Sequence, residues 1–129
     1  GGNNTVSYSG ALGSVSVDLG LQGQSQNTIA DGFDTLLNFQ NLIGSSYSDT
    51  LKGDANTNII SGGAGDDVIY GIAGSNYLYG GLGNDTFIGK LTGNDFIDGE
   101  SGNDKVDYSS LTQANSITES AYQRDAGVA

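Results

Sequence analysis

Large apolar residues recur once every nine positions between Gly44 and Asp107 of this chain. Each nine-residue repeat starts with glycine, has Asp or Asn at its sixth position and has an apolar residue at its eighth. The repeat that starts at Gly89 departs from this spacing, because it contains ten residues. The apolar eighth positions, with the ninth residue of the ten-residue repeat counted as their equivalent, are Leu51, Ile60, Ile69, Leu78, Phe87, Ile97 and Val106. The pattern therefore indicates seven copies of one small structural unit.

The nine-residue period excludes an amphipathic helix. A helix that covers a core has apolar residues about three or four positions apart, and each glycine in its interior costs about 1 kcal/mol. The three residues around each eighth position, such as Val68-Ile69-Tyr70, fit a very short strand whose middle side chain points inward. The preceding six residues, rich in Gly, Asn and Asp, predict a turn that includes positive φ angles.

Two such strands and two such turns form one coil of 18 residues. Stacked coils place equivalent strands side by side, about 4.8 Å apart, and bring the eighth positions together in a thin core. The predicted fold is all-β: a right-handed parallel β-roll, which is a two-faced β-solenoid with 18 residues per coil.

Alternate repeats lie on the same edge of such a roll, so the sixth positions form two columns. Carboxylates stacked about 4.8 Å apart repel by roughly 1 kcal/mol per pair even in water. A divalent cation between successive loops removes this repulsion, and calcium is favoured because it accepts about six to eight oxygen ligands in flexible geometry. Asn58 and Asn76 are instead expected to form a hydrogen-bonded ladder along the stack. We call the two columns the Asp edge, with Asp49, Asp67, Asp85 and Asp104, and the Asn edge, with Asn58, Asn76 and Asp95.

The composition narrows the possible functions. The chain has 129 residues, of which 15 are acidic and 4 are basic, and its net charge is -11. Such an acidic surface repels phosphate and excludes nucleic acid as a partner, and no apolar run is long enough for membrane insertion. Without Cys or His, the chain cannot form disulfides, zinc sites of the usual kind, thiol nucleophiles or histidine triads. Because the repeat already accounts for the acidic columns, we predict that this segment is not an enzyme.

Two repeats carry a recognisable motif. GGAGDDVIY from Gly62 and GGLGNDTFI from Gly80 match GGxGxDxUx, where U is large and apolar, at every defined position. Residues 44–107 therefore resemble the RTX calcium-binding β-roll, a family of repeats found in secreted bacterial toxins, adhesins, proteases and alginate-modifying enzymes. The resemblance implies that several calcium ions are the cofactors of this segment.

The resemblance also implies the ligands. In such proteins each ion lies between two loops of one edge: the first gives the carbonyls of its second and fourth residues and its Asp, and the next gives the carbonyls of its first and third residues and its Asp. The first expected site consists of Gly63, Gly65, Asp67, Gly80, Leu82 and Asp85. The second consists of Gly81, Gly83, Asp85, Gly99, Ser101 and Asp104. The third consists of Ser45, Tyr47, Asp49, Gly62, Ala64 and Asp67, where Ser45 and Tyr47 replace glycines. On the Asn edge, Asp95 is a candidate ligand together with the carbonyls of Ile72 and Gly74.

The flanking segments follow the repeat only loosely. Residues 1–43 are expected to form non-calcium β coils or a cap that continue the roll, and residues 108–129 a C-terminal cap or linker. Within the first segment, Asp34 and Leu36 resemble the ligand and core positions of a further repeat.

The resemblance implies a module of a secreted bacterial protein, exported by a type I system, that folds on calcium binding outside the cell. We predict a rigid structural or adhesive spacer, and the likeness of residues 3–9 to residues 103–109 favours neighbouring repeats in a longer chain. The alternative is an accessory module of a secreted protease, lipase or alginate-modifying enzyme that aids folding and secretion or binds polysaccharide. For polysaccharide, the outward-facing Tyr70, Tyr77 and Tyr79 are the candidate contacts.

Overall fold

The computed structural model describes residues 3–88 and 95–107 and the backbone of residues 125–126. These residues form short strands, turns and one 3-10 turn, η1 (Leu19–Leu21). The strands are β1 (Thr5–Ser7), β2 (Ser16–Asp18), β3 (Ser25–Asn27), β4 (Phe33–Thr35), β5 (Asn41–Ile43), β6 (Thr50–Lys52), β7 (Ile59–Ala64), β8 (Val68–Tyr70), β9 (Tyr77–Leu82), β10 (Thr86–Ile88), β11 (Phe96–Ser101), β12 (Lys105–Asp107) and β13 (Asp125–Ala126). Within this described part, no helix is long and apolar enough to cross a membrane.

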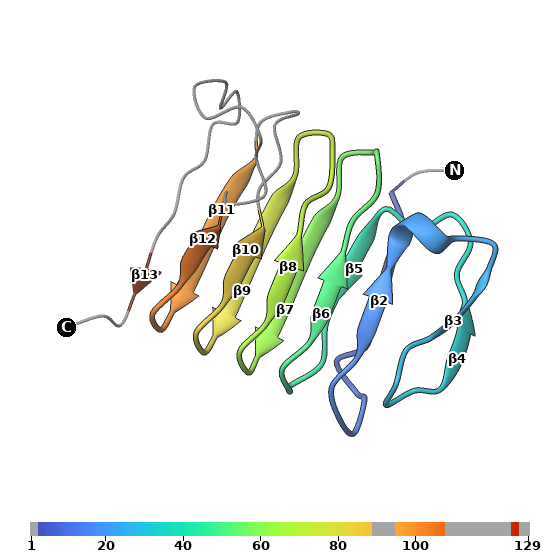
Figure 1. The fold of residues 1–129 in the computed structure, drawn as a ribbon, viewed down its shortest axis with the longest axis horizontal. Helices are drawn as coiled ribbons and strands as arrows, with labels where there is room; N and C mark the ends of the chain where they lie inside the picture. Colours follow the sequence, from blue (N-terminus) through green and yellow to red (C-terminus); the bar gives the residue numbers. More distant parts are fainter. Residues whose placement is uncertain (1–2, 89–94, 108–124, 127–129) are drawn as a thin grey trace.

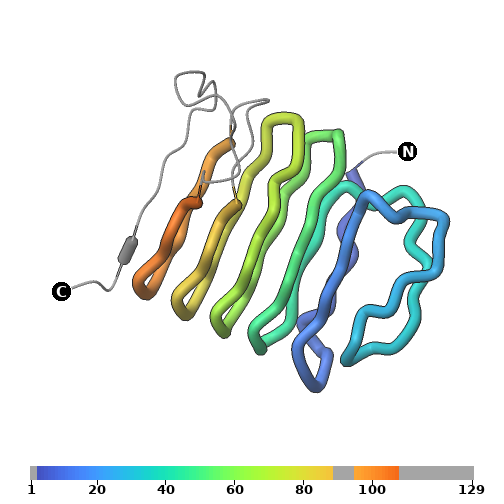
Figure 2. The backbone as a smooth tube through the Cα atoms, viewed as in Figure 1, coloured from blue at the N-terminus to red at the C-terminus, as the bar shows by residue number. Residues whose placement is uncertain are grey.

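The chain winds back and forth between two parallel sheets (Figures 1 and 2). One sheet contains, in spatial order, β1, β5, β7, β9, β11 and β13, and the other contains β12, β10, β8, β6 and β2. Ile59 lies opposite Tyr77 in the first sheet and Val68 opposite Thr86 in the second, so equivalent residues of successive coils are 18 positions apart. The predicted parallel β-roll with 18 residues per coil is confirmed.

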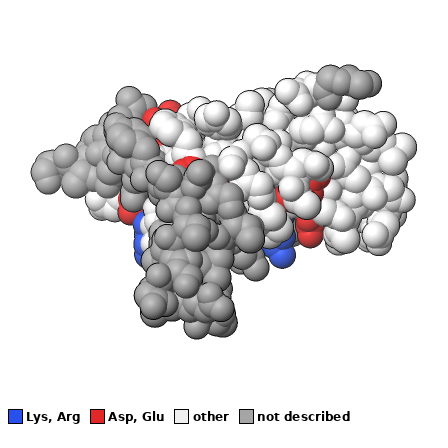
Figure 3. Space-filling view, turned by 90° about the horizontal axis from the view of Figure 1, so that it is seen from above, with Lys and Arg blue, Asp and Glu red and all other residues white. Residues whose placement is uncertain are grey.

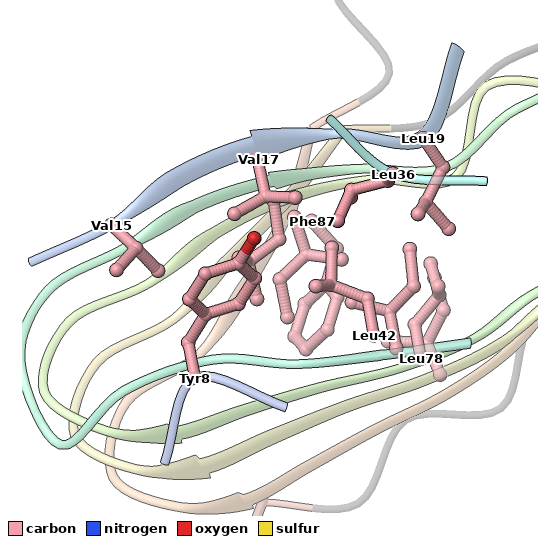
Figure 4. Close-up of a cluster of buried hydrophobic side chains, with 12 residues drawn as sticks. Tyr8, Val15, Val17, Leu19, Leu36, Leu42, Leu78 and Phe87 are labelled. Atoms are coloured by element: carbon pink, nitrogen blue, oxygen red, sulfur yellow. The ribbon is translucent and has the colours of Figure 1, made fainter. Parts of the chain in front are cut away.

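The eighth positions of the repeats form the core. Each is the middle residue of a three-residue stretch of strand, so its side chain points inward while its two neighbours point outward. Leu42 and Val17 extend the two rows toward the N-terminus, and Figure 4 shows the side chains of the two sheets meeting in a narrow interior. The fully buried members are Leu51, Ile60, Ile69, Leu78, Phe87 and Ile97, and Val106 is partly buried.

The ten-residue repeat shifts the register without turning its core residue outward. Phe96 lies opposite Tyr77, one position beyond the regular spacing, and Ile97 still lies opposite Leu78 in the core. A one-residue slip inside the strand would have moved Ile97 to the outer face. The extra residue therefore lies before Asp95, in a segment outside the described residues.

An antiparallel hairpin interrupts the first coils of the roll. β3 and β4 pair antiparallel, whereas β1 and β2 pair in parallel with β5 and β6. Oδ2 of Asp34 accepts hydrogen bonds from the hydroxyl groups of Tyr8 (2.9 Å) and Thr28 (3.0 Å). Asp34 therefore belongs to a hairpin and does not occupy the sixth position of a further coil.

The hairpin also covers the outer edge of β2. Oε1 of Gln26 accepts the backbone N–H of Asp18 (2.8 Å), and Nε2 of Gln26 donates to the carbonyl of Asp18 (3.0 Å). Gln26 is itself buried. One side-chain amide thus takes the place of a neighbouring strand and satisfies groups that an open sheet edge would offer to another chain.

Candidate metal centre

The two consensus loops of the Asp edge share a left-handed backbone at their second and fourth positions, with φ from 97° at Gly65 to 119° at Gly83. A Cβ added to Gly81 would collide with the carbonyl oxygen of Gly63, and one added to Gly83 would collide with that of Gly65. The second and fourth carbonyls of one loop therefore point at the next loop. Only glycine leaves these oxygens room.

The carboxylates of the Asp edge form a continuous column. Asp67 and Asp85 are each 1% exposed. Oδ1 of Asp67 accepts the backbone N–H of Asp49 (2.8 Å), and Oδ1 of Asp85 accepts that of Asp67 (2.8 Å). Asp104 continues the column, since its Oδ1 accepts the N–H of Asp85 (2.9 Å). One oxygen of each carboxylate thus ties its own coil to the coil before it.

The second oxygens of Asp67 and Asp85 are the most informative atoms of the site. Both Oδ2 atoms are buried and have no hydrogen-bond partner. A Cβ added to Gly62 would meet Asp67 Oδ2 and also the carbonyl oxygen of Gly80, at 2.7 Å. A Cβ added to Gly80 would meet Asp85 Oδ2 and also the carbonyl oxygen of Gly99, at 2.8 Å. Buried acceptors that converge without a donor are a place for a cation, so these residues fit a calcium ion.

Burial also changes the acidity of this pair. Burial raises the pKa of Asp67 from its ordinary 3.8 to about 8; the N–H of Asp49 opposes the rise, and the charges of Asp49, Asp85 and Asp66 add to it. Burial likewise raises the pKa of Asp85 to about 6. Without a cation, a proton is the charge that these carboxylates take up most readily.

An ion at this edge would take most of its ligands from the main chain. Among the described residues, no group of three or more carboxylate, imidazole or thiol side chains gathers in a way that could hold a metal. Two carboxylates together with carbonyls from two successive loops are a donor set that calcium accepts, because its geometry is flexible and its ligands are hard oxygens.

Asp49 differs from the two carboxylates that follow it. Ser45 donates its N–H to Asp49 Oδ2 (2.6 Å) and its hydroxyl to Asp49 Oδ1 (2.6 Å). The N–H of Val15 also donates to Asp49 Oδ1 (2.8 Å). Both oxygens of Asp49 are therefore already hydrogen-bonded. The serine that replaces a consensus glycine adds a hydroxyl donor that glycine lacks.

The Asn edge carries the expected ladder. Asn58 donates its backbone N–H to Asn76 Oδ1 (2.9 Å), and Asn76 donates its backbone N–H to Asp95 Oδ1 (2.9 Å). Asp95 is 5% exposed. Residues 89–94, which precede Asp95 in the same loop, lie outside the described residues. The position of the candidate ligand Asp95 is therefore described only by its contacts with the Asn76 coil.

A second ladder on the Asp edge was not predicted. It joins the fifth positions and runs in the opposite direction, since each side chain accepts the N–H of the following coil. Ser48 Oγ accepts from Asp66 N (2.9 Å), Asp66 Oδ1 from Asn84 N (2.8 Å), and Asn84 Oδ1 from Asn103 N (2.8 Å). The signal was present in the sequence, because every one of these fifth positions carries a short polar side chain.

Comparison with known families agrees with this geometry. The model of the RTX calcium-binding nonapeptide repeat (4 copies) matches residues 43–75, 53–87 and 91–110. The chain belongs to this RTX family. No curated protein matches the chain. The resemblance drawn from the two consensus repeats is confirmed. The chain is therefore a calcium-binding repeat module, which we call the RTX module.

Replacement of Gly81 by Ala should damage the site. The new Cβ would meet the Gly63 carbonyl in a left-handed backbone, so we expect the unfolding free energy in saturating calcium to fall by about 2 kcal/mol and calcium to bind more weakly. Urea unfolding and calorimetric calcium titration measure the two effects. Gly10→Ala is the matched control, since a Cβ there meets nothing within 4 Å. Equal effects at Gly10 and Gly81 would contradict the loop geometry.

The metal-free RTX module should lose stability as the pH rises. Since the pKa of Asp67 is about 8 in the roll and 3.8 in an unfolded chain, the folded state holds this proton more tightly. Its stabilising effect is complete below pH 3.8 and disappears as the pH rises to about 8. Circular dichroism in chelator should therefore show more β structure at about pH 5 than at about pH 8. The Asp67→Asn variant should show a weaker pH dependence, and a β signal that grows with rising pH would contradict the assignment.

Proposed function

We propose that the RTX module binds calcium ions between successive loops of the Asp edge, folds as it binds them, and serves outside the cell as a rigid structural or adhesive spacer. The observation that carries this proposal is the pair of buried oxygens, Oδ2 of Asp67 and of Asp85, that have no partner. The calcium ion supplies the positive charge that these oxygens need.

Two sites of the Asp edge have the strongest support. Each combines carbonyls that point across the gap between loops with a buried carboxylate oxygen that lacks a donor. Asp85 belongs to both sites, so it would contact two ions. The first site comprises Gly63, Gly65, Asp67, Gly80, Leu82 and Asp85. The second comprises Gly81, Gly83, Asp85, Gly99, Ser101 and Asp104. The third set, Asp49 with Ser45, Tyr47, Gly62, Ala64 and Asp67, ranks below them because Asp49 already accepts three hydrogen bonds.

Folding should depend on the metal because little else holds the roll together. Each nine-residue repeat buries one large apolar side chain, and 22 glycines raise the conformational entropy of the unfolded chain. A net charge of -11 adds repulsion. Calcium that binds only the folded state shifts the equilibrium toward it. Extracellular calcium modules bind at about 10⁻⁴ to 10⁻³ M, which confines folding to the outside of the cell.

Family membership supports export from a bacterium, by a type I system, in unfolded form. A stack of similar coils is suited to a spacer, since the two parallel sheets and the ladder of the Asp edge continue from coil to coil along the stacking direction. The accessory module of a secreted enzyme is the alternative, and it uses the same calcium sites.

Calcium should convert the RTX module from a largely disordered chain to the β-roll. At neutral pH we expect a weak β signal in chelator and a strong one at about 10⁻³ M calcium, measured by circular dichroism. Asp85→Asn should raise the calcium concentration needed by about tenfold or more, because Asp85 serves both sites. Asp31→Asn removes the same charge from an exposed turn and should leave the transition in place. A wild-type chain already folded in chelator would overturn the proposal.

A second candidate function, polysaccharide binding, is favoured by one group of aromatic side chains. The ring centroids of Tyr77 and Tyr79 lie 6.2 and 6.0 Å from that of Phe96, and Tyr77 is 48% exposed. Tyr70 lies in the other sheet, where Nζ of Lys52 is 5.0 Å from its ring centroid. The expected set of three tyrosines is therefore divided between two faces, and the group around Phe96 is the better candidate.

Titration with a neutral oligosaccharide would test this group. If the surface binds sugar, the ring resonances of Tyr77 and Tyr79 should shift in the calcium-loaded protein, and Tyr77→Ala should abolish the binding. Tyr70→Ala, on the opposite sheet, is the control and should bind as the wild type does. Unchanged tyrosine resonances would exclude the group as a sugar site.

A further inference from the structure

One loop of the Asn edge has the same backbone as the consensus loops of the Asp edge. In the loop from Gly71 to Asn76, the second and fourth residues again have positive φ, 71° at Ile72 and 81° at Gly74. These are the positions that are left-handed in the consensus loops of the Asp edge. A left-handed isoleucine is costly, by about 1 kcal/mol or more, so the contacts of this loop must outweigh that strain. The loop has the backbone of a metal-binding turn but carries Asn at position six.

The side-chain amide of Asn76 is fully hydrogen-bonded. Its Nδ2 donates to the carbonyls of Gly71 (3.0 Å) and Ala73 (3.1 Å) and to Oδ1 of Asp95 (3.0 Å). Its Oδ1 accepts the N–H of Asn58 (2.9 Å). Gly71 and Ala73 are the first and third positions of the loop. On the Asp edge, the carbonyls at those positions are offered to the ion.

The terminal atoms of Asn76 and Asp67 occupy equivalent places. A Cβ added to Gly71 would meet Asn76 Nδ2 at 3.0 Å and Asp95 Oδ2 at 3.1 Å. A Cβ added to Gly62 would meet Asp67 Oδ2 and an oxygen of the next loop in the same way. At one edge the atom in this place is a donor with three acceptors around it. At the other edge it is an acceptor with no partner.

Asn58, one coil earlier, is oriented differently, because its Oδ1 lies nearest to Gly53 and accepts the N–H of Asp54 (2.9 Å). Its Nδ2 donates to the carbonyl of Gln40 (2.7 Å) and to Oδ1 of Asp54 (3.1 Å). Seen from the side of this edge, most of the described surface carries uncharged side chains (Figure 3). The two loops of this edge that the structure describes are thus closed by hydrogen bonds of the chain itself.

We propose that the amide of Asn76 does in its own loop what a calcium ion does at the Asp edge, so that this loop of the Asn edge is closed without metal. The inference rests on the proposed calcium sites of the Asp edge and assigns the opposite edge a different role. In the folded roll this loop needs no ion, while the Asp edge responds to calcium. The residue at position six decides which kind of edge a loop makes.

Exchange of the two residue types tests the inference. In the Asp67→Asn/Asp85→Asn double variant, the new Nδ2 groups should donate to the first and third carbonyls of their own loops, as Nδ2 of Asn76 does. In chelator this variant should show more β structure than the wild type and unfold at a temperature higher by about 5 °C or more, although it has lost calcium ligands. Its response to calcium should be much weaker than that of the wild type.

The reverse exchange should make the Asn edge depend on metal. Asn76→Asp removes the amide donor and places a second carboxylate beside Asp95. We expect less β structure than in the wild type in chelator, and a larger gain on addition of calcium. Circular dichroism and thermal unfolding, with and without calcium, measure both exchanges.

The controls change the same charges at position five. Asp66→Asn and Asn84→Asp keep the oxygen that accepts the N–H of the next coil, so they should not exchange the behaviour of the edges. A double variant no more structured in chelator than the wild type or Asp66→Asn would overturn the inference. A wild-type chain that does not respond to calcium would instead overturn the proposed function, so the two failures are distinguishable.

Discussion

Buried carboxylates stacked at the spacing of a β-sheet are the constraint on which this roll depends. Hydrogen bonds between parallel strands fix the distance from coil to coil, so Asp67 and Asp85 cannot move apart to relieve their repulsion. Water cannot screen them either, because both are buried. Positive charge or a hydrogen-bond donor has to reach Oδ2, and a metal ion, a proton and a neighbouring N–H group are the available means. At Asp67 and Asp85, the raised pKa values and the Oδ2 atoms without a partner show that such a charge or donor is lacking. At Asp49, the donors of Ser45 meet the requirement.

Polar groups carry an unusual share of the order in this fold. The core is a double row one side chain deep, so apolar burial does not by itself determine how one coil lies on the next. Two ladders at the Asp edge do so, because the position-six carboxylate accepts an N–H from the coil before it and the position-five side chain accepts an N–H from the coil after it. A slip of one residue would break both ladders and expose the core row. Register is thus determined by short polar side chains that a hydrophobicity profile does not detect.

The sequence was sufficient to predict the repeating part. The period of nine, the coil of 18 residues, the buried eighth positions and the two columns all follow from spacing, and the structure has each of them. The N-terminal segment was harder, because turns rich in Gly, Asn and Asp can close a hairpin as well as a coil, and only the pairing of β3 with β4 decides between them. The hydrogen bonds of Asp49 could not be predicted, because they come from the backbone and hydroxyl of Ser45 and from Val15, which is 34 residues away in the sequence. The separation of Tyr70 from Tyr77, by contrast, could have been predicted, since consecutive repeats belong to opposite sheets.

The alternation of the two edges limits how such a chain can lengthen. Each coil contains one repeat with its loop at the Asp edge and one with its loop at the Asn edge. Duplication of 18 residues therefore adds a coil and preserves both columns. Duplication of nine residues would keep the period and the core row, yet every later Asp would move to the opposite side of the roll. The smallest heritable unit of growth is therefore twice the visible motif.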